Sequence, residues 1–294
     1  MITIDTKICK TCGICGVVCP RHIPETVEVN GKKVTVISED RIALCMECGH
    51  CQAVCPENAI RVERLREESF DPIVPLGVDE RQLLNLMRQR RSVRRYKKKQ
   101  VPRQVLDRIV EAARFAPTGT GQRTNGIIVV ENPETLKRLS ALFYDLYRSL
   151  DKALSNPIGR YIVKRRVGLR TLNTLRDFVM PGMRWYIKWY QEGRGDEISR
   201  DCPVLMLFHS PVDVPMTSQN CLIAAFHSIF MAESLGVGTC FNDLIPPACG
   251  MIPEAREMLG LPKDHEVYAS ITMGYPKYPF KRVIPRQLAT VDYI

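Results

Sequence analysis

Apolar residues first recur at helical spacing in residues 79–91. Leu83, Leu86 and Met87 fall three or four positions apart, which places them on one face of a helix. Asp79 stands just before this run, where a carboxylate can accept the first free backbone N–H groups. The pattern therefore predicts a helix that begins at Asp79.

A second helix is predicted directly downstream. Pro102 suits the first helical position, and Val105, Ile109 and Ala116 lie along one apolar face. Pro117 cannot continue the helix, so the helix should stop there. The loop that follows consists of small residues, and it leads into an apolar run at 126–131 that is typical of a buried strand.

Alternating residues around Asn30-Gly31 predict a β-hairpin near the start of the chain. The run Val27-Glu-Val-Asn-Gly-Lys-Lys-Val-Thr-Val alternates apolar and polar positions on both sides of the Asn-Gly pair. Asn-Gly is the preferred pair for a two-residue hairpin turn.

A Pro- and Gly-containing stretch at residues 66–80 separates two regions of different composition. We therefore expect a first domain at residues 1–65, a linker at 66–78 and a second domain at 79–294. The length of 294 residues fits two domains. A 45% hydrophobic content is ordinary for globular proteins and excludes a disordered or fibrous chain.

Neither a membrane span nor a leader peptide is predicted. No apolar stretch approaches the ~20 residues needed to cross a bilayer, and the first residues, MITIDTKICK, contain no apolar leader segment. We therefore expect a cytoplasmic protein, in which clustered thiols bind metals or react rather than form disulfides.

Eight of the 12 cysteines occur in the first 55 residues, in two copies of C-x₂-C-x₂-C-x₃-C-P. In such a run three thiolates bind one iron–sulfur cubane, and the fourth reaches the other cluster. The spacing predicts two [4Fe–4S] clusters. One would be bound by Cys9, Cys12, Cys15 and Cys55, and the other by Cys45, Cys48, Cys51 and Cys19.

Zinc is the alternative metal that paired cysteines could bind. A zinc site, however, needs only four ligands, and it does not need a regularly spaced third cysteine before Cys-Pro. The first 65 residues resemble the two-cluster bacterial ferredoxins, with a longer spacer where the hairpin is predicted. The four later cysteines (Cys202, Cys221, Cys240 and Cys249) are expected to be small buried apolar residues. A ferredoxin-like domain transfers single electrons, so the second domain should contain their destination.

All of the net charge of +10 lies downstream of residue 65, since residues 1–65 contain eight basic and eight acidic side chains. The basic run at 90–95 can bind a phosphate through guanidinium groups. A solvated basic face or a nucleic-acid site is the alternative interpretation of such a run.

Several motifs in order along the second domain resemble the FMN-dependent nitroreductase family. They are Arg90-Arg91-Ser92-Val93-Arg94, the helix that ends at Ala116-Pro117-Thr118, the strand at 201–208, the long helix at 218–235, the turn Gly236-Val-Gly-Thr-Cys-Phe241, and Gly274-Tyr275-Pro276 followed by Lys281-Arg282.

The resemblance implies an α+β fold, with a central mixed sheet flanked by helices, and a homodimer with FMN at its interface. It implies FMN-phosphate contacts from Arg90, Arg91, Ser92, Arg94, Lys281 and Arg282. It also implies contacts to the ring or ribityl chain from Thr118, Gly119, Thr120, Thr239, Cys240 and Phe241. Where many family members have N-x-Q-P-W, this chain has other residues, so Gln122 or Arg123 would have to supply ring contacts there.

The segment at about 135–200 matches the family least and combines many basic residues with aromatic ones. We interpret it as a helical insertion that covers the flavin and selects the substrate. Extra dimer surface and a helix lying on a membrane are the alternatives, and a membrane role is the less favoured of the two.

Together the two domains predict an oxidoreductase. An external donor such as ferredoxin or flavodoxin would reduce the clusters, the clusters would reduce FMN, and FMN would reduce a small electrophile such as a nitroaromatic, a quinone or an activated double bond. NAD(P)H would then be unnecessary. The alternatives are an electron-transfer or sensory module without a dedicated substrate, and a nucleic-acid-binding protein, which we do not expect.

Overall fold

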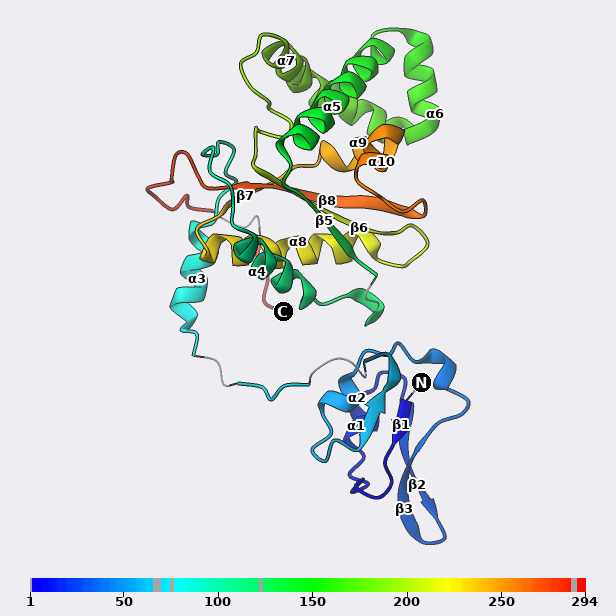
Figure 1. Ribbon diagram of the computed structural model, residues 1–294. Helices are drawn as coiled ribbons and strands as arrows, with labels where there is room; N and C mark the ends of the chain where they lie inside the picture. Colours follow the sequence, from blue (N-terminus) through cyan, green and yellow to red (C-terminus); the bar gives the residue numbers. More distant parts are fainter. Residues whose placement is uncertain (1, 66–69, 75–76, 122–123, 287–289) are drawn as a thin grey trace. The chain divides into compact units, whose positions relative to one another are not determined.

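The computed structural model describes residues 2–65, 70–74, 77–121, 124–286 and 290–294. The chain divides into two compact units, one formed by residues 1–77 with 119–123 and the other by 78–118 with 124–294. Each unit has its own hydrophobic core. An N-terminal ferredoxin-like part and a larger α+β part are therefore both present (Figure 1).

The first unit is built from two short antiparallel sheets. Strand β1 (Ile2–Ile4) pairs with β4 (Ile60–Val62), so segments nearly 60 residues apart in the sequence lie side by side. Strands β2 (Pro24–Val29) and β3 (Lys32–Ile37) form a hairpin with Asn30 and Gly31 at its tip. Both tip residues have positive φ, as a type I′ turn requires, which confirms the predicted hairpin.

The duplicated cysteine motif is also a duplicated backbone. Gly13 and Gly49, 36 positions apart, both adopt left-handed φ and immediately precede the short helices α1 (Ile14–Val18) and α2 (His50–Ala53). Thr11 has its counterpart in Glu47 at the same offset, and both have positive φ. Only a sharply curved backbone can turn several closely spaced thiolates toward one point, and the curvature is the same in both repeats.

The second unit is organised around a four-stranded sheet in the order β5-β6-β8-β7. Its three strand pairs are antiparallel, and an isolated parallel bridge joins Ser92 to Thr239 at the β7 edge. The strands are β5 (Gly126–Val130), β6 (Val204–Pro211), β7 (Gly238–Phe241) and β8 (His265–Gly274).

Alternating residues of β6 supply two cores, one on each face of the sheet. Met206 and Phe208 pack into the cluster formed with α4 (Arg103–Arg114) and α8 (Thr217–Ser234). Leu205 and Leu207 pack instead into the cluster formed with α5 (Pro133–Leu154) and α9 (Ile245–Met251). All four side chains are completely buried, as expected for an inner strand that is covered on both faces.

Figure 1 shows α4 and α8 against one face of the sheet and α5 and α9 against the other. That second layer also contains the helices between α5 and β6, where the sequence predicted a helical insertion. The helices not yet given are α3 (Glu80–Gln89), α6 (Pro157–Thr174), α7 (Met180–Gln191) and α10 (Pro253–Met258), with short helical turns η1 (Ile42–Leu44), η2 (Glu63–Leu65), η3 (Gly119–Gly121) and η4 (Leu175–Val179).

The starts of α3 and α4 follow local capping chemistry, with one difference from the predictions. The carboxylate of Asp79 accepts the Arg81 backbone N–H at 2.8 Å, which confirms the predicted start of α3. Pro102 is the residue before α4 rather than its first residue, and it has extended ψ. Because the Pro102 carbonyl accepts the N–H groups of Val105 and Leu106, Pro102 acts as the cap.

Candidate functional site

The structure sorts the eight N-terminal cysteines into two sets of four. One pocket is lined by Cys9, Cys12, Cys15 and Cys55, and the other by Cys19, Cys45, Cys48 and Cys51. Each set thus contains three cysteines of one repeat and the last cysteine of the other. The two pockets are equally small, with a volume of about 20 Å³ each.

Backbone N–H groups point at the sulfurs of both sets. Thr11 donates to Cys9 Sγ at 3.4 Å, and Glu47 donates to Cys45 Sγ at 3.3 Å, at equivalent positions of the two repeats. Ala59 donates to Cys55 Sγ at 3.3 Å. Such donors stabilise negative charge on thiolate sulfur, so the surroundings of both pockets suit thiolate ligands.

Burial raises the pKa of the Cys51 thiol to about 11 and also raises the pKa of Cys15. A raised pKa keeps a bare thiol protonated at neutral pH, so iron binding at these cysteines would release protons. Among the described residues, no group of three or more His, Cys, Asp or Glu side chains is arranged around a single ion.

A third pocket combines arginines from distant parts of the chain. We call it the arginine pocket, and its volume is about 370 Å³. Its walls come from the end of α3 and from the C-terminal segment. They consist of Met87, Arg88, Arg90, Arg91, Val283, Ile284, Pro285 and Arg286.

Arg91 is the buried member of the arginine pocket. One of its guanidinium nitrogens donates to the Arg90 carbonyl at 2.7 Å and another to the Ile284 carbonyl at 3.3 Å. Its Nε is buried and has no hydrogen-bond partner within the part of the chain that the structure describes. An unsatisfied buried N–H is costly, and an anion at this position would satisfy it.

The electrostatics of the arginine pocket also favour an anion. Burial lowers the pKa of Arg90, and the nearby Arg286 lowers it further, because each cation disfavours the other. Burial raises the pKa of Glu233, while Arg90 and Arg91 oppose that rise. A phosphate would relieve the repulsion between the arginines.

The segment after the arginine run lies along the β7 edge of the sheet. The Val93 N–H donates to the Thr239 carbonyl at 2.9 Å, next to the Ser92–Thr239 bridge. A Cβ on Gly238 would lie 2.6 Å from Val93 Cγ2, so only glycine permits this approach. The structure thus brings the predicted phosphate segment and the predicted turn at 239–241 side by side.

The other predicted contact residues differ in position. Thr239 and Cys240 are buried, and Ser92 and Phe241 are half-buried. Arg94, Lys281 and Arg282 are exposed and lie outside the wall of the arginine pocket, whereas Arg286 lies in it. No local motif surrounds Arg286, so sequence reasoning missed it.

The small-residue loop is only partly described. Thr118 and Gly119 are half-buried at the start of η3. The Thr120 side chain and the whole of Gln122 and Arg123 lie outside the described residues, so the ring contacts predicted for them stay predictions. The four later cysteines are all buried, as expected for small apolar residues.

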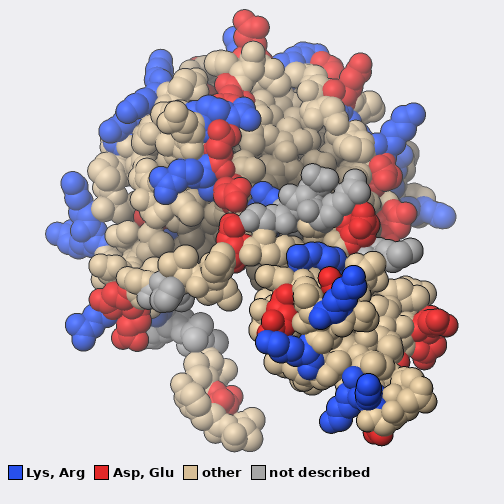
Figure 2. Space-filling model, turned by 60° about the horizontal axis from the view of Figure 1, so that its bottom comes forward, with Lys and Arg blue, Asp and Glu red and all other residues tan. Residues whose placement is uncertain are grey.

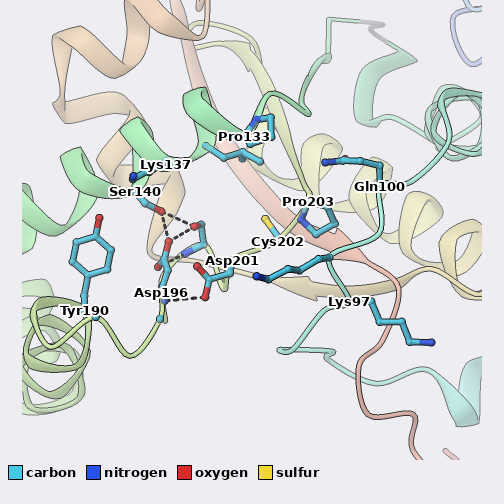
Figure 3. A pocket seen from close by; sticks show the side chains of 15 residues that line it. Lys97, Gln100, Pro133, Lys137, Ser140, Tyr190, Asp196, Asp201, Cys202 and Pro203 are labelled. Atoms are coloured by element: carbon cyan, nitrogen blue, oxygen red, sulfur yellow. Dashed lines mark hydrogen bonds between the residues drawn. The ribbon is translucent and has the colours of Figure 1, made fainter.

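A further cavity, shown in Figure 3, lies between α5 and the segment before β6. At its floor the buried carboxylate of Asp196 accepts hydrogen bonds from the hydroxyls of Ser140 and Ser199 and from the Ser199 N–H at 2.9 Å. Lys97 and Lys137 line the same cavity. Because Asp196 is fully engaged by neighbouring donors, it holds the 196–199 turn against α5.

Known proteins resemble both units. The family model described as "Nitroreductase family" matches residues 87–275, which is more than half of the chain. This chain belongs to the nitroreductase family. A "4Fe-4S dicluster domain" matches residues 8–67, so this nitroreductase-family oxidoreductase has an N-terminal iron–sulfur domain.

Individual relatives of this nitroreductase-family chain are distant. An NADH dehydrogenase of Thermus thermophilus is 26% identical over 210 residues, covering 66% of this chain and 88% of that protein. An iodotyrosine deiodinase of Thermotoga neapolitana is 23% identical, covering 69% and 96%. A nitroreductase of Bacteroides fragilis with bound FMN is 21% identical, covering 74% of this chain and 100% of that one, with a TM-score of 0.56.

Proposed function

We propose that this protein transfers electrons from an external one-electron donor through two [4Fe–4S] clusters to FMN, for the reduction of a small electrophile. The observation that carries the proposal is the sorting of eight cysteines into two sets of four, each completed by a cysteine of the other repeat. Two such clusters have no open coordination position for a substrate, so they suit electron transfer.

FMN is proposed because related structures contain it and because the arginine pocket fits its phosphate. Arg90, Arg91 and Arg286 would neutralise the phosphate, and the orphaned Nε of Arg91 would gain a partner. The buried residues Thr239 and Cys240 would exclude water from one side of the ring. Bound FMN accepts electrons singly and releases them in pairs, which couples a one-electron supply to two-electron chemistry.

The remaining predicted contacts belong to the same proposal. Ser92 and Arg94 would support the phosphate from the segment beside β7, and Lys281 and Arg282 would lie at its outer side. Thr118, Gly119 and Thr120 would contact the ring or ribityl chain, together with Phe241.

A homodimer with FMN at its interface completes the proposal. Helix α8 exposes Leu222 and Phe226, and α3 exposes Leu83 and Leu84, although all four are large apolar side chains. An apolar surface of this kind suits burial against a second copy. Phe226→Asp should therefore give monomers with weakened FMN binding in analytical ultracentrifugation and flavin titration.

Anaerobic purification with chemical counting tests the cofactor content. We expect about eight iron, about eight sulfide and one FMN per chain. About four iron, or zinc in place of iron, would contradict the two-cluster proposal. A chain that contains iron but neither retains nor binds FMN would contradict the flavin part alone.

The electron path is tested by mixing the protein with reduced ferredoxin or flavodoxin and following flavin bleaching. The donor-reduced protein is then exposed to nitroaromatics, quinones and activated alkenes. Rapid reoxidation by one class, with a stoichiometric product, would identify the acceptor. If NADH reduced the flavin equally well in protein from which the clusters had been removed, the proposed route would be contradicted.

A further inference from the structure

Helix α6 buries almost none of its own surface. Of its 18 residues only Leu172 is buried, and Ile158, Tyr161 and Ile162 are each about half exposed or more. Helices in proteins are stabilised mainly by packing of an apolar face. The side chains of α6 that could provide such packing instead face solvent.

The exposed apolar residues of α6 form one stripe that also contains Arg165, which donates to the Tyr161 hydroxyl at 3.5 Å, and that is bordered by further cations. Ile158, Tyr161 and Ile162 are spaced three and four positions apart and therefore share a face. Lys164 and Arg166 lie at the two edges of that face, and both are exposed. Long basic side chains at such edges can keep their charges in water while their stems cover apolar surface.

The charge of α6 has a single sign. Residues 157–174 contain five Lys or Arg and no Asp or Glu. Within the described residues, none of these five cations takes part in an ion pair, although ion pairs occur on the neighbouring helices α5 and α7. The face drawn in Figure 2, by contrast, mixes acidic and basic side chains.

We propose that the exposed face of α6 docks on an anionic lipid surface. Residues 157–167 contain no uncharged polar side chain except Tyr161, so the face offers cations and apolar groups but almost no hydrogen-bond acceptors. Protein interfaces contain donors and acceptors on both sides, whereas lipid phosphates only accept. A second copy of this basic face would be repelled by the first.

The proposed docking leaves the proposed dimer face free. Helix α6 lies in the layer above the sheet in Figure 1, whereas α8 lies against the opposite face. No described helix is long and apolar enough to cross a bilayer. The attachment is therefore peripheral and should be reversible by salt.

Vesicle binding by the full-length holoprotein tests the proposal. The probes are vesicles of phosphatidylcholine alone and of phosphatidylcholine with about one-third phosphatidylglycerol. We expect co-sedimentation with the anionic vesicles at low salt, none with the neutral vesicles, and release at high salt. Arg165→Glu/Arg166→Glu should weaken binding about 30-fold or more, because each cation near an anionic surface contributes substantially.

Two comparison variants make the result specific. Arg108→Glu/Lys263→Glu changes the net charge equally through exposed residues outside α6 and should retain vesicle binding. Ile158→Ser/Ile162→Ser should weaken binding without changing its salt dependence. Because these side chains are exposed, both α6 variants should keep the melting temperature and the flavin content.

Several results would overturn the proposal. The first is absence of binding to anionic vesicles at low salt. The second is a loss of vesicle binding in the Arg108/Lys263 control as large as the loss in the Arg165/Arg166 variant. The third is a changed oligomeric state of the Arg165/Arg166 variant, which would make α6 a contact between copies. Retention on immobilised polyglutamate without vesicle binding would indicate an acidic protein partner instead.

Discussion

The two cysteine pockets and the arginine pocket are assembled from the chain in opposite ways. Each cysteine pocket takes three of its cysteines from seven consecutive residues, and the local backbone, with Gly13 or Gly49 in left-handed φ, sets their directions. The arginine pocket instead joins residues on either side of the whole second unit, as the hydrogen bond from Arg91 to Ile284, 193 positions away, shows. A local motif can therefore be recognised in the sequence, whereas a pocket whose residues are far apart along the chain can be recognised only in the folded structure.

Removing one cysteine should have the largest effect, and it should affect the cysteine pockets without affecting FMN binding. Cys48→Ala should lower the iron content from about eight to about four per chain, because a cubane needs its four thiolates. Reduction by ferredoxin should fall to background, while FMN stays bound and reducible by dithionite. Cys249→Ala, which removes a buried cysteine of the second unit, should keep the full iron content. Ferredoxin-driven turnover in Cys48→Ala would show that the clusters are not the route.

Arginine substitutions test whether the pocket wall or the predicted basic pair binds the phosphate. Arg286→Ala should weaken FMN binding about 10- to 100-fold, the usual effect of losing a charged hydrogen bond. Lys281→Ala/Arg282→Ala should change the affinity by less than about threefold, since both side chains are exposed outside the wall. Flavin fluorescence titration measures both. The reverse order would restore the assignment made from sequence.

His209 and His265 offer a test of the sheet itself. Their Nδ1 atoms lie 2.8 Å apart, and burial, with a smaller contribution from His265, lowers the pKa of His209 below 6.5. A depressed histidine pKa means that the folded state binds fewer protons than the unfolded one. Stability should therefore fall as the pH drops below about 6.5. Urea unfolding of His265→Asn should show a flatter acid dependence than the wild type.

Glu233 should have the smallest effect, and it concerns the arginine pocket. Burial raises its pKa, so its ionised form is disfavoured in the folded state and stability decreases as the pH rises through that pKa. Glu233→Gln should slightly stabilise the protein at neutral pH, tighten FMN binding by about threefold or less, and flatten the pH dependence of FMN binding. Tighter binding of FMN by the wild type at higher pH would contradict this.

Much of the fold followed from short-range patterns. The Asn30-Gly31 turn, the cap at Asp79 and the helices α3 and α4 were predicted from spacing and capping chemistry, which act within a few residues. The start of β6 was placed too early, at Asp201 instead of Val204. Arg200 and Asp201 have positive φ, and the Asp201 carboxylate accepts the Asp196 N–H. Asp196 is held in turn by Ser140 of α5, which is a tertiary contact.

By itself, the sequence determined the two cysteine sets, because a cubane requires thiolates at particular spacings and both repeats have those spacings. It also determined the family through motifs in a fixed order. Tertiary structure alone decided that Arg286 joins Arg90 and Arg91, that His209 meets His265, and that α6 leaves its apolar stripe in solvent. These depend on how distant segments pack, and packing depends on shape complementarity across the whole unit rather than on any local pattern.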